Sequence, residues 1–207
     1  DKAISLIRSA ARPVILAGNG VIVANAAPEL MALATELEIP VATSLLGKGA
    51  FPESHTFSLG MVGMHGRPVA NRAMGLADLI IVIGARFSDR STGRKDRFAS
   101  QARVIHLDLD PAEIDKSVGA DVWLLGNASK LMDTLRLAVR GTQCANHREW
   151  LAELAMMNDR EPLQRDVSHT EIKPWHIMSA LYDATGGEAV VTTEVGQHQM
   201  WAALYYK

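Results

Sequence analysis

The stretch DLIIVIGARFSDR, residues 78–90, contains the strongest strand pattern in the chain. A continuous apolar run from Leu79 to Ile83 ends at Gly84 and is followed by charged residues. A run of this length that closes in a glycine turn is typical of a β-strand covered on both faces. Such strands occur in parallel sheets, so this stretch predicts the central strand of an α/β domain.

The same succession of strand, turn and helix extends outward on both sides of this stretch. Further strands are predicted at residues 13–17, 40–43, 104–108 and 122–126, and helices at residues 28–37, 69–77 and 128–139. This alternation predicts a Rossmann-like parallel sheet with helices on both faces.

We expect this sheet to occupy a domain of residues 1–140. A polar linker, residues 141–172, follows and holds one helical stretch near Trp150. Residues 173–207 then begin a second α/β domain, with a helix, a strand at 189–193 and the start of another helix. The chain lacks an initial methionine and ends within an amphipathic run, so we expect a piece of a longer protein.

Composition limits the classes of function. The 207 residues carry 21 basic and 23 acidic side chains, and this balance excludes a basic surface for nucleic acid or for an anionic membrane. Cys144 is the single cysteine, which excludes an internal disulfide framework and fits a reducing compartment, the cytoplasm or the interior of an organelle. No apolar run reaches the roughly 18 residues of a membrane span.

Glycine turns follow two of the predicted strands. Gly18 and Gly20 would allow a pyrophosphate to approach the backbone at a helix N-terminus. An ordinary tight turn is an equal alternative, because Val23 stands where the dinucleotide fingerprint has a third glycine.

Residues 43–68 form a long glycine-rich segment, and loops of this length usually bind a ligand. Within it, His65 lies between glycines and would allow a flat ring to approach, although a solvent-exposed histidine is the alternative.

Charged residues follow two other strands. Arg86 and Arg90, with Asp89 between them, form a plausible clamp for phosphate or carboxylate, and a salt-bridged surface loop is the alternative. Asp108 closes the next strand and could accept hydrogen bonds from ribose hydroxyls, whereas Asp110 is interpreted as a helix cap.

A last candidate is the turn at residues 194–201. Gly196 opens a helix whose amides could hold phosphate, with Gln197 and His198 as additional donors. The other histidines lack metal-ligand spacing to acidic or thiol partners, so we predict no metal site in this chain; they are His55, His106, His147, His169 and His176.

Four segments, taken in order, carry a resemblance to a known family: residues 47–53, 60–66, 84–93 and 196–201. Together they resemble the large catalytic subunits of acetolactate synthase (acetohydroxyacid synthase), which are thiamine-diphosphate-dependent enzymes. The likeness covers nearly the whole chain. It implies decarboxylation of pyruvate and transfer of the two-carbon unit to pyruvate or 2-ketobutyrate, in the biosynthesis of the branched-chain amino acids isoleucine and valine.

The resemblance also implies cofactors and site residues. FAD would have a structural, non-redox role and contact Gly18, Gly20, Thr43, Leu45, Gly63, Met64, His65, Gly66, Gly84, Ala85, Arg86 and Asp89, with Asp108 and Leu109 at its adenosine end. The diphosphate of thiamine diphosphate would contact Val195, Gly196, Gln197 and His198. Arg90 would be catalytic, as the residue that receives the carboxylate of the second 2-ketoacid. Two positions depart from the family's pattern. Ser88 stands where the family usually has aspartate, and Asn127 stands where the aspartate of a Gly-Asp-Ala sequence is usual, so a polar residue replaces a polar residue at both.

Partners follow from the same resemblance. It implies a homodimer or homotetramer of large subunits, with a small regulatory subunit. The family's cofactor-activating glutamate and its Mg²⁺ ligands would lie outside this chain, so the chain alone is expected to be inactive. Two other interpretations remain: another thiamine-diphosphate-dependent decarboxylase or oxidase, and a nucleotide-binding module without catalysis.

Overall fold

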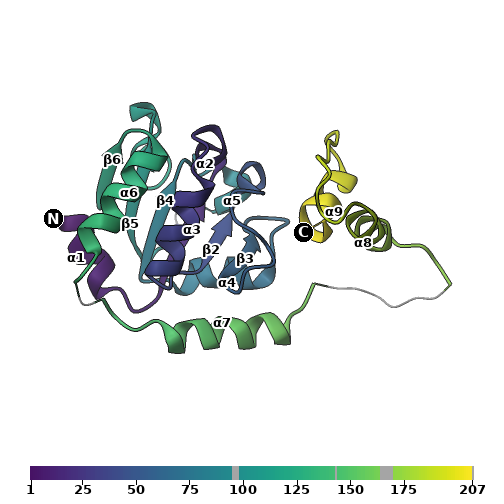
Figure 1. The fold of residues 1–207 in the computed structure, drawn as a ribbon, viewed down its shortest axis with the longest axis horizontal. Coiled ribbons are helices and arrows are strands. Elements are labelled where there is room, and N and C mark those ends of the chain that lie inside the picture. Colours follow the sequence, from purple (N-terminus) through teal and green to yellow (C-terminus); the bar gives the residue numbers. More distant parts are fainter. Residues whose placement is uncertain (95–97, 143, 164–169, 207) are drawn as a thin grey trace. The chain divides into compact units, whose positions relative to one another are not determined.

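A computed structural model describes residues 1–94, 98–142, 144–163 and 170–206. The chain forms two compact units, Asp1–Glu161 and Pro162–Lys207, which we call the first and the second unit (Figure 1). In the described ranges, none of the helices has the length and apolar character needed to span a membrane.

The described part of the first unit contains a parallel sheet of six strands in the order β3-β2-β1-β4-β5-β6. The central strand β4 pairs along its whole length with β1 on one side and with β5 on the other. Every residue of β1 and β4 is buried, as the continuous apolar runs predicted. The predicted α/β fold is confirmed; its strands are β1 Pro13–Ala17, β2 Val41–Thr43, β3 Ser58–Met61, β4 Leu79–Ile83, β5 Arg103–Asp108 and β6 Val122–Leu125.

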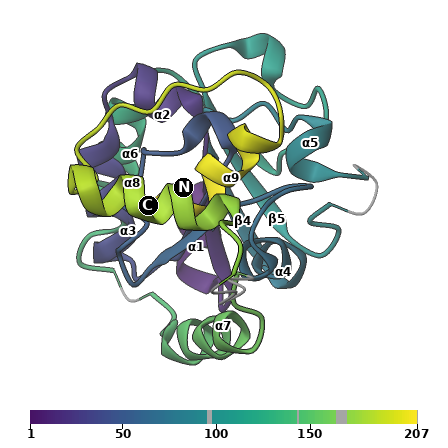
Figure 2. The ribbon, with the colours of Figure 1, turned by 90° about the vertical axis from the view of Figure 1, so that its right-hand side faces the viewer.

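Helices cover both faces of this sheet. Successive side chains of a strand point to opposite faces. Ile81 therefore packs with α1 Lys2–Ser9, α3 Ala27–Glu36 and α6 Ala128–Val139, whereas Ile80 packs with α4 Pro68–Leu76 and α7 Arg148–Arg160. Figure 2 shows α3 and α6 to one side of the strands and α4 to the other. Short helical turns follow four of the strands: α2 Asn19–Val23, η1 Leu45–Gly47, α5 Asp89–Thr92 and η2 Pro111–Glu113.

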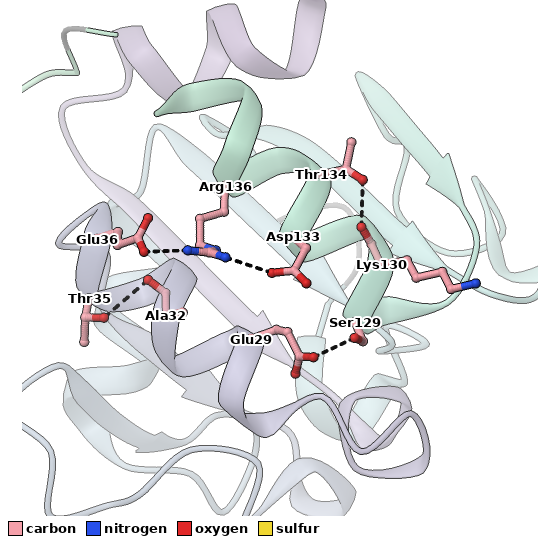
Figure 3. A network of polar contacts seen from close by, with 9 residues as sticks. All are labelled: Glu29, Ala32, Thr35, Glu36, Ser129, Lys130, Asp133, Thr134 and Arg136. Atoms are coloured by element: carbon pink, nitrogen blue, oxygen red, sulfur yellow. Dashed lines mark hydrogen bonds and ion pairs between the residues drawn. The ribbon is translucent and has the colours of Figure 1, made fainter. Parts of the chain in front are cut away.

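Polar contacts join α3 to α6 above their buried apolar sides (Figure 3). Ser129 Oγ donates a hydrogen bond to Glu29 Oε1 at 2.7 Å. Arg136 donates to Glu36 at 2.7 Å and to Asp133 at 3.2 Å. Ion pairs near a surface contribute little to stability, so these contacts mainly fix how the two helices lie against each other.

The first unit extends beyond residue 140, where we expected its boundary. Helix α7 lies in the expected linker, but Trp150 and Leu154 are buried with the side chains of α4. Trp150 Nε1 also donates to Pro13 O at 3.1 Å. The two apolar side chains are four residues apart and lie on one face of the helix, which explains why a mostly polar segment packs against the sheet.

Two further expectations differ from the structure. Residues 43–68, expected as a loop, contain the short edge strand β3, whose Gly60 weakens the strand pattern in the sequence. Residues 189–193, expected as a strand, are not one, and Val190 is 92% exposed. A strand needs a hydrogen-bonded neighbour, and the described part of the second unit supplies none.

The second unit consists, in its described part, of helices α8 Pro174–Thr185 and α9 Gln197–Tyr205 and the segment that joins them. The rings of Tyr182 and Tyr206 meet edge to face at 5.5 Å. Thr185 Oγ1 and Tyr206 Oη are hydrogen-bonded at 2.9 Å. The two helices are thus held together by contacts between the C-terminal end of α8 and the C-terminal end of α9.

Candidate functional site

The carboxyl ends of the parallel strands meet at one edge of the sheet. The strand order reverses between β1 and β4, because β1 is followed by β2 and β3 on one side and β4 by β5 and β6 on the other. Open parallel sheets bind ligands at such a reversal. The predicted site residues of the first unit lie at or just after these carboxyl ends, which we call the carboxyl edge; Figure 1 shows α2 and α5 there.

The turns after β1 and β4 are in direct backbone contact. Gly18 N donates to Ile83 O at 2.9 Å and Gly20 N donates to Gly84 O at 3.0 Å. A Cβ atom on Gly20 would lie 2.6 Å from the Cα of Gly84, which itself has a φ of 57°. These glycines therefore allow two turns to touch, and the amides of Gly18 and Gly20 are used within the protein. A phosphate at this point would have to contact other atoms.

The turn after β2 packs onto the same edge. Ser44 N donates to Ala17 O at 2.9 Å, and a Cβ atom on Gly47 would lie 2.3 Å from that oxygen. Thr43 is buried, and its Oγ1 has no hydrogen-bond partner among the described residues. Leu45 is partly buried beside it. An unpartnered buried hydroxyl is uncommon and marks a position where a ligand atom could be bound.

The loop Gly63–Gly66 contacts Arg90, which comes from the turn after β4. Met64 N donates to Arg90 O at 2.9 Å, and the Nη1 atom of Arg90 lies 3.9 Å from the Met64 sulfur. Gly63 has a φ of 115°, and a Cβ atom there would lie 2.3 Å from Arg90 O. The side chain of Asn71 holds Gly63 by bonds to its N–H and C=O. The structure thus brings together two segments that were predicted separately, with His65 exposed to solvent.

The turn after β4 directs its charged side chains outward. Phe87 is buried and adopts a φ of 51°, an uncommon value for a residue with a side chain. Arg86 is 77% exposed, and its Nε lies 3.9 Å from the buried carboxylate of Glu113. Asp89 Oδ1 accepts a hydrogen bond from Arg90 N at 2.9 Å, inside the turn. The guanidinium group of Arg86 is therefore accessible to a ligand. The carboxylate of Asp89 is used within the turn, at the start of α5.

At the end of β5, Asp108 Oδ1 accepts a hydrogen bond from Asp110 N at 2.9 Å. Asp110 accepts one from Ala112 N, which confirms its interpretation as a cap. Leu109 is 73% exposed between them. Val23, Leu46 and Met64 also expose their side chains at this edge. Several exposed apolar side chains at one edge are typical of a surface that binds an apolar or flat group.

His106 is a residue of this edge that the sequence prediction did not assign. Its ring is fully buried, and its Nε2 lies 3.7 Å from Asp108 Oδ2. Burial lowers the pKa of His106, although Asp108, a backbone contact with Ala85, and the carboxylates of Glu113 and Asp115 act to raise it. A histidine between Ile105 and Leu107 is a polar interruption of an apolar strand, and this was the signal that could have identified it.

The two departures from the family's pattern lie at the starts of helices. Asn127 Oδ1 accepts a hydrogen bond from Ser129 N at 3.0 Å at the start of α6. Ser88 precedes α5, and its carbonyl oxygen accepts hydrogen bonds from the Ser91 and Thr92 amides. Asn127 therefore caps α6 through its side chain, whereas the Ser88 side chain makes no capping bond and its Oγ lies 3.2 Å from Ser91 Oγ.

In the second unit, Gly196 precedes α9 and Val195 is 91% exposed. Gln197 and His198 are exposed in the first turn of the helix, where backbone N–H groups have no partner inside the helix. A Cβ atom on Gly196 would lie 3.0 Å from the His198 ring. Within the described ranges, no group of three or more histidine, cysteine, aspartate or glutamate side chains could hold a metal ion.

The strand order and the turns at the carboxyl edge define an open, doubly wound α/β domain of the class that binds ligands at that edge. Residues 1–135 match the family described as thiamine pyrophosphate enzyme, central domain. The chain belongs to this family of thiamine pyrophosphate enzymes, as its motifs predicted.

Relatives similar to the chain along its length are acetolactate synthase large subunits. The probable one of Methanocaldococcus jannaschii is 42% identical over 100% of this chain and 36% of its own length. That of Parasynechococcus marenigrum is 43% identical over 99% of this chain and 33% of its own length. The isozyme 3 large subunit of Escherichia coli is 38% identical over 99% and 36%. The chain thus spans about a third of the length of these relatives.

The contact between the turns after β1 and β4 predicts a large difference between two glycine substitutions. Gly20→Ala should lower the free energy of unfolding by about 1–3 kcal/mol, because its methyl group has no room against Gly84. Gly75→Ala is the matched control in α4, where a Cβ atom meets nothing within 4 Å. It should be neutral or raise the stability by up to about 1 kcal/mol. Urea denaturation measures both, and equal effects would contradict the packing described here.

The pKa of His106 predicts a contribution to acid sensitivity. Its pKa is lower in the folded than in the unfolded protein, so the unfolded state binds more protons. The stability contributed by the neutral ring is therefore complete above the unfolded value of about 6.5 and is lost as the pH falls below it. His106→Phe should show a weaker decrease of unfolding free energy between pH 7 and pH 5 than the wild type. If the unfolding free energy of both proteins decreases equally between pH 7 and pH 5, His106 does not contribute to acid sensitivity in this way.

Proposed function

We propose that the protein containing this chain is an acetolactate synthase large subunit. It would decarboxylate pyruvate and transfer the two-carbon unit to pyruvate or 2-ketobutyrate, in branched-chain amino acid biosynthesis. The observation that carries this proposal is the contact between the loop Gly63–Gly66 and Arg90. Two segments that resemble the family separately in the sequence form one surface at the carboxyl edge.

FAD is the proposed ligand of this edge, in a structural role. The unpartnered hydroxyl of Thr43 and the exposed side chains of Leu46 and Met64 are compatible with a polar chain that carries a flat apolar ring. Asp108 and Leu109 would contact the adenosine end, and Arg86 would contact the phosphates. The remaining proposed contacts come from the turns already described: Gly18, Gly20, Leu45, Gly63, Met64, His65, Gly66, Gly84, Ala85 and Asp89.

The second unit would contribute to binding thiamine diphosphate, which supplies the carbanion chemistry of the family. Val195, Gly196, Gln197 and His198 would hold its diphosphate at the N-terminus of α9, where amide donors and the helix dipole favour an anion. Mg²⁺ would be bound by residues outside this chain. Arg90 is exposed and would bind the carboxylate of the second 2-ketoacid, because a guanidinium group can donate two parallel hydrogen bonds to it.

The proposed assembly is a homodimer or homotetramer of large subunits with a small regulatory subunit. Its support is the similarity to relatives named large subunits. The proposed compartment is the cytoplasm or the interior of an organelle, in agreement with a single cysteine in 207 residues.

The full-length protein is expected to be yellow and to bind FAD stoichiometrically. A visible absorption spectrum before and after pyruvate is added should show a flavin that is not reduced, while acetolactate accumulates. A flavin bleached by pyruvate would instead indicate an oxidase, and a protein without flavin would contradict the nucleotide site.

Arg86→Ala should weaken FAD binding about tenfold, the range expected for a lost charge-assisted hydrogen bond. Arg103→Ala is the matched control, because Arg103 is an exposed arginine that begins β5 at the opposite edge of the sheet. Equal losses in both variants would exclude a specific contact of Arg86.

A further inference from the structure

His106 has an unusual environment for a histidine. Its side chain is fully buried, and neither ring nitrogen has a hydrogen bond of good geometry among the described residues, although a backbone contact with Ala85 acts to raise its pKa. Burying a polar group without a partner is unfavourable, so such groups usually have a specific reason to be present. The backbone of Ala85 and the carboxylate of Asp108 face this ring, and both residues belong to the proposed FAD site.

The ring of His106 is fixed in place by its neighbours. Phe87 meets it edge to face with a centroid distance of 5.1 Å, and Phe98 in turn packs on Phe87 at 5.9 Å. Strand β5 fixes the backbone of His106, which pairs with Val82 on one side and with Trp123 on the other. Rotation of this ring would disturb the core, so any adjustment falls to its partner.

Asp108 is the partner that can adjust. One carboxylate oxygen, Oδ1, is held by the amide of Asp110 at 2.9 Å. The other, Oδ2, lies 3.7 Å from His106 Nε2, which is too far for a hydrogen bond. A movement of about 0.8 Å would bring the two atoms to hydrogen-bond distance.

The charge states of the two groups suit such a bond. Burial lowers the pKa of His106, so its ring is neutral near pH 7 and carries one N–H donor. With the proton on Nε2, the ring can donate to Asp108 without forming an ion pair. The carboxylate then keeps its negative charge and its remaining lone pairs for hydroxyl groups of a ligand.

We propose that His106 is a positioning residue that donates a hydrogen bond from Nε2 to Asp108 Oδ2 when a ribose binds at the carboxyl edge. The amide of Asp110 and the ring of His106 then hold the two carboxylate oxygens from opposite sides. Asp108 is oriented so that it can accept hydrogen bonds from the ribose hydroxyls. This inference rests on the proposed function, because it requires a nucleotide at this edge.

A double-mutant cycle on FAD affinity tests this proposal. Flavin-free full-length protein is titrated with FAD in four forms: wild type, His106→Phe, Asp108→Asn and the double variant. His106→Phe keeps an aromatic ring in the core but has no donor, and it should weaken FAD binding about tenfold, or about 1.4 kcal/mol. Since His106 acts through Asp108, the double variant should bind FAD no more weakly than Asp108→Asn alone.

A rescue variant and a stability control complete the experiment. His106→Gln restores an N–H donor and should recover part of the lost affinity. Thermal unfolding without FAD shows whether each variant is folded, and a variant that loses the fold is replaced by His106→Leu in the same cycle. Additive losses in the double variant would show that His106 is a packing residue only, as would an unchanged affinity of His106→Phe. A wild type that does not bind FAD would overturn the proposed function itself.

Discussion

The backbone contact between the turns after β1 and β4 fixes how the loops of the carboxyl edge pack together. Gly20 donates to the carbonyl oxygen of Gly84 at 3.0 Å, and neither residue has room for a side chain. These two turns follow β1 and β4, between which the strand order reverses, so their contact closes the centre of the carboxyl edge. The turn after β2 packs on the first through Gly47, and the loop after β3 packs on the second through Gly63. Four loops from different parts of the chain thereby form one continuous surface.

This close packing determines how the edge can bind a ligand. The amides of Gly18 and Gly20 are engaged within the protein, so recognition falls to side chains around the closed centre. These side chains differ in chemistry along the edge: a buried hydroxyl on Thr43, an exposed guanidinium on Arg86 and a partly held carboxylate on Asp108. Such a series suits a long ligand with a phosphate group between a sugar and a flat ring, which is why the proposed function places FAD there. His106 lies beneath one end of this series and connects it to the core.

Local sequence patterns predicted five of the six strands of the sheet, all but β3, because continuous apolar runs and glycine turns are local features. Contacts that depend on the assembled fold were not predictable in this way. The approach of Met64 to Arg90 joins residues 26 positions apart. The indole N–H of Trp150 donates to the carbonyl group of Pro13, a residue 137 positions earlier in the chain. The strand expected at residues 189–193 does not form. An apolar run becomes a strand only when neighbouring strands pair with it, and a local pattern does not contain that information. His106 was overlooked because its spacing was judged only for metal binding, whereas its meaning lies in the buried strand around it.

Hydrogen–deuterium exchange of the full-length protein, with and without FAD, tests whether the carboxyl edge forms one ligand-binding surface. FAD should slow exchange in the turns of this edge, at residues 43–47, 63–66, 84–90 and 108–110. No change is expected at the opposite edge of the sheet, where residues 10–13 and 77–79 lie. Protection at the opposite edge, or none at the carboxyl edge, would contradict the account.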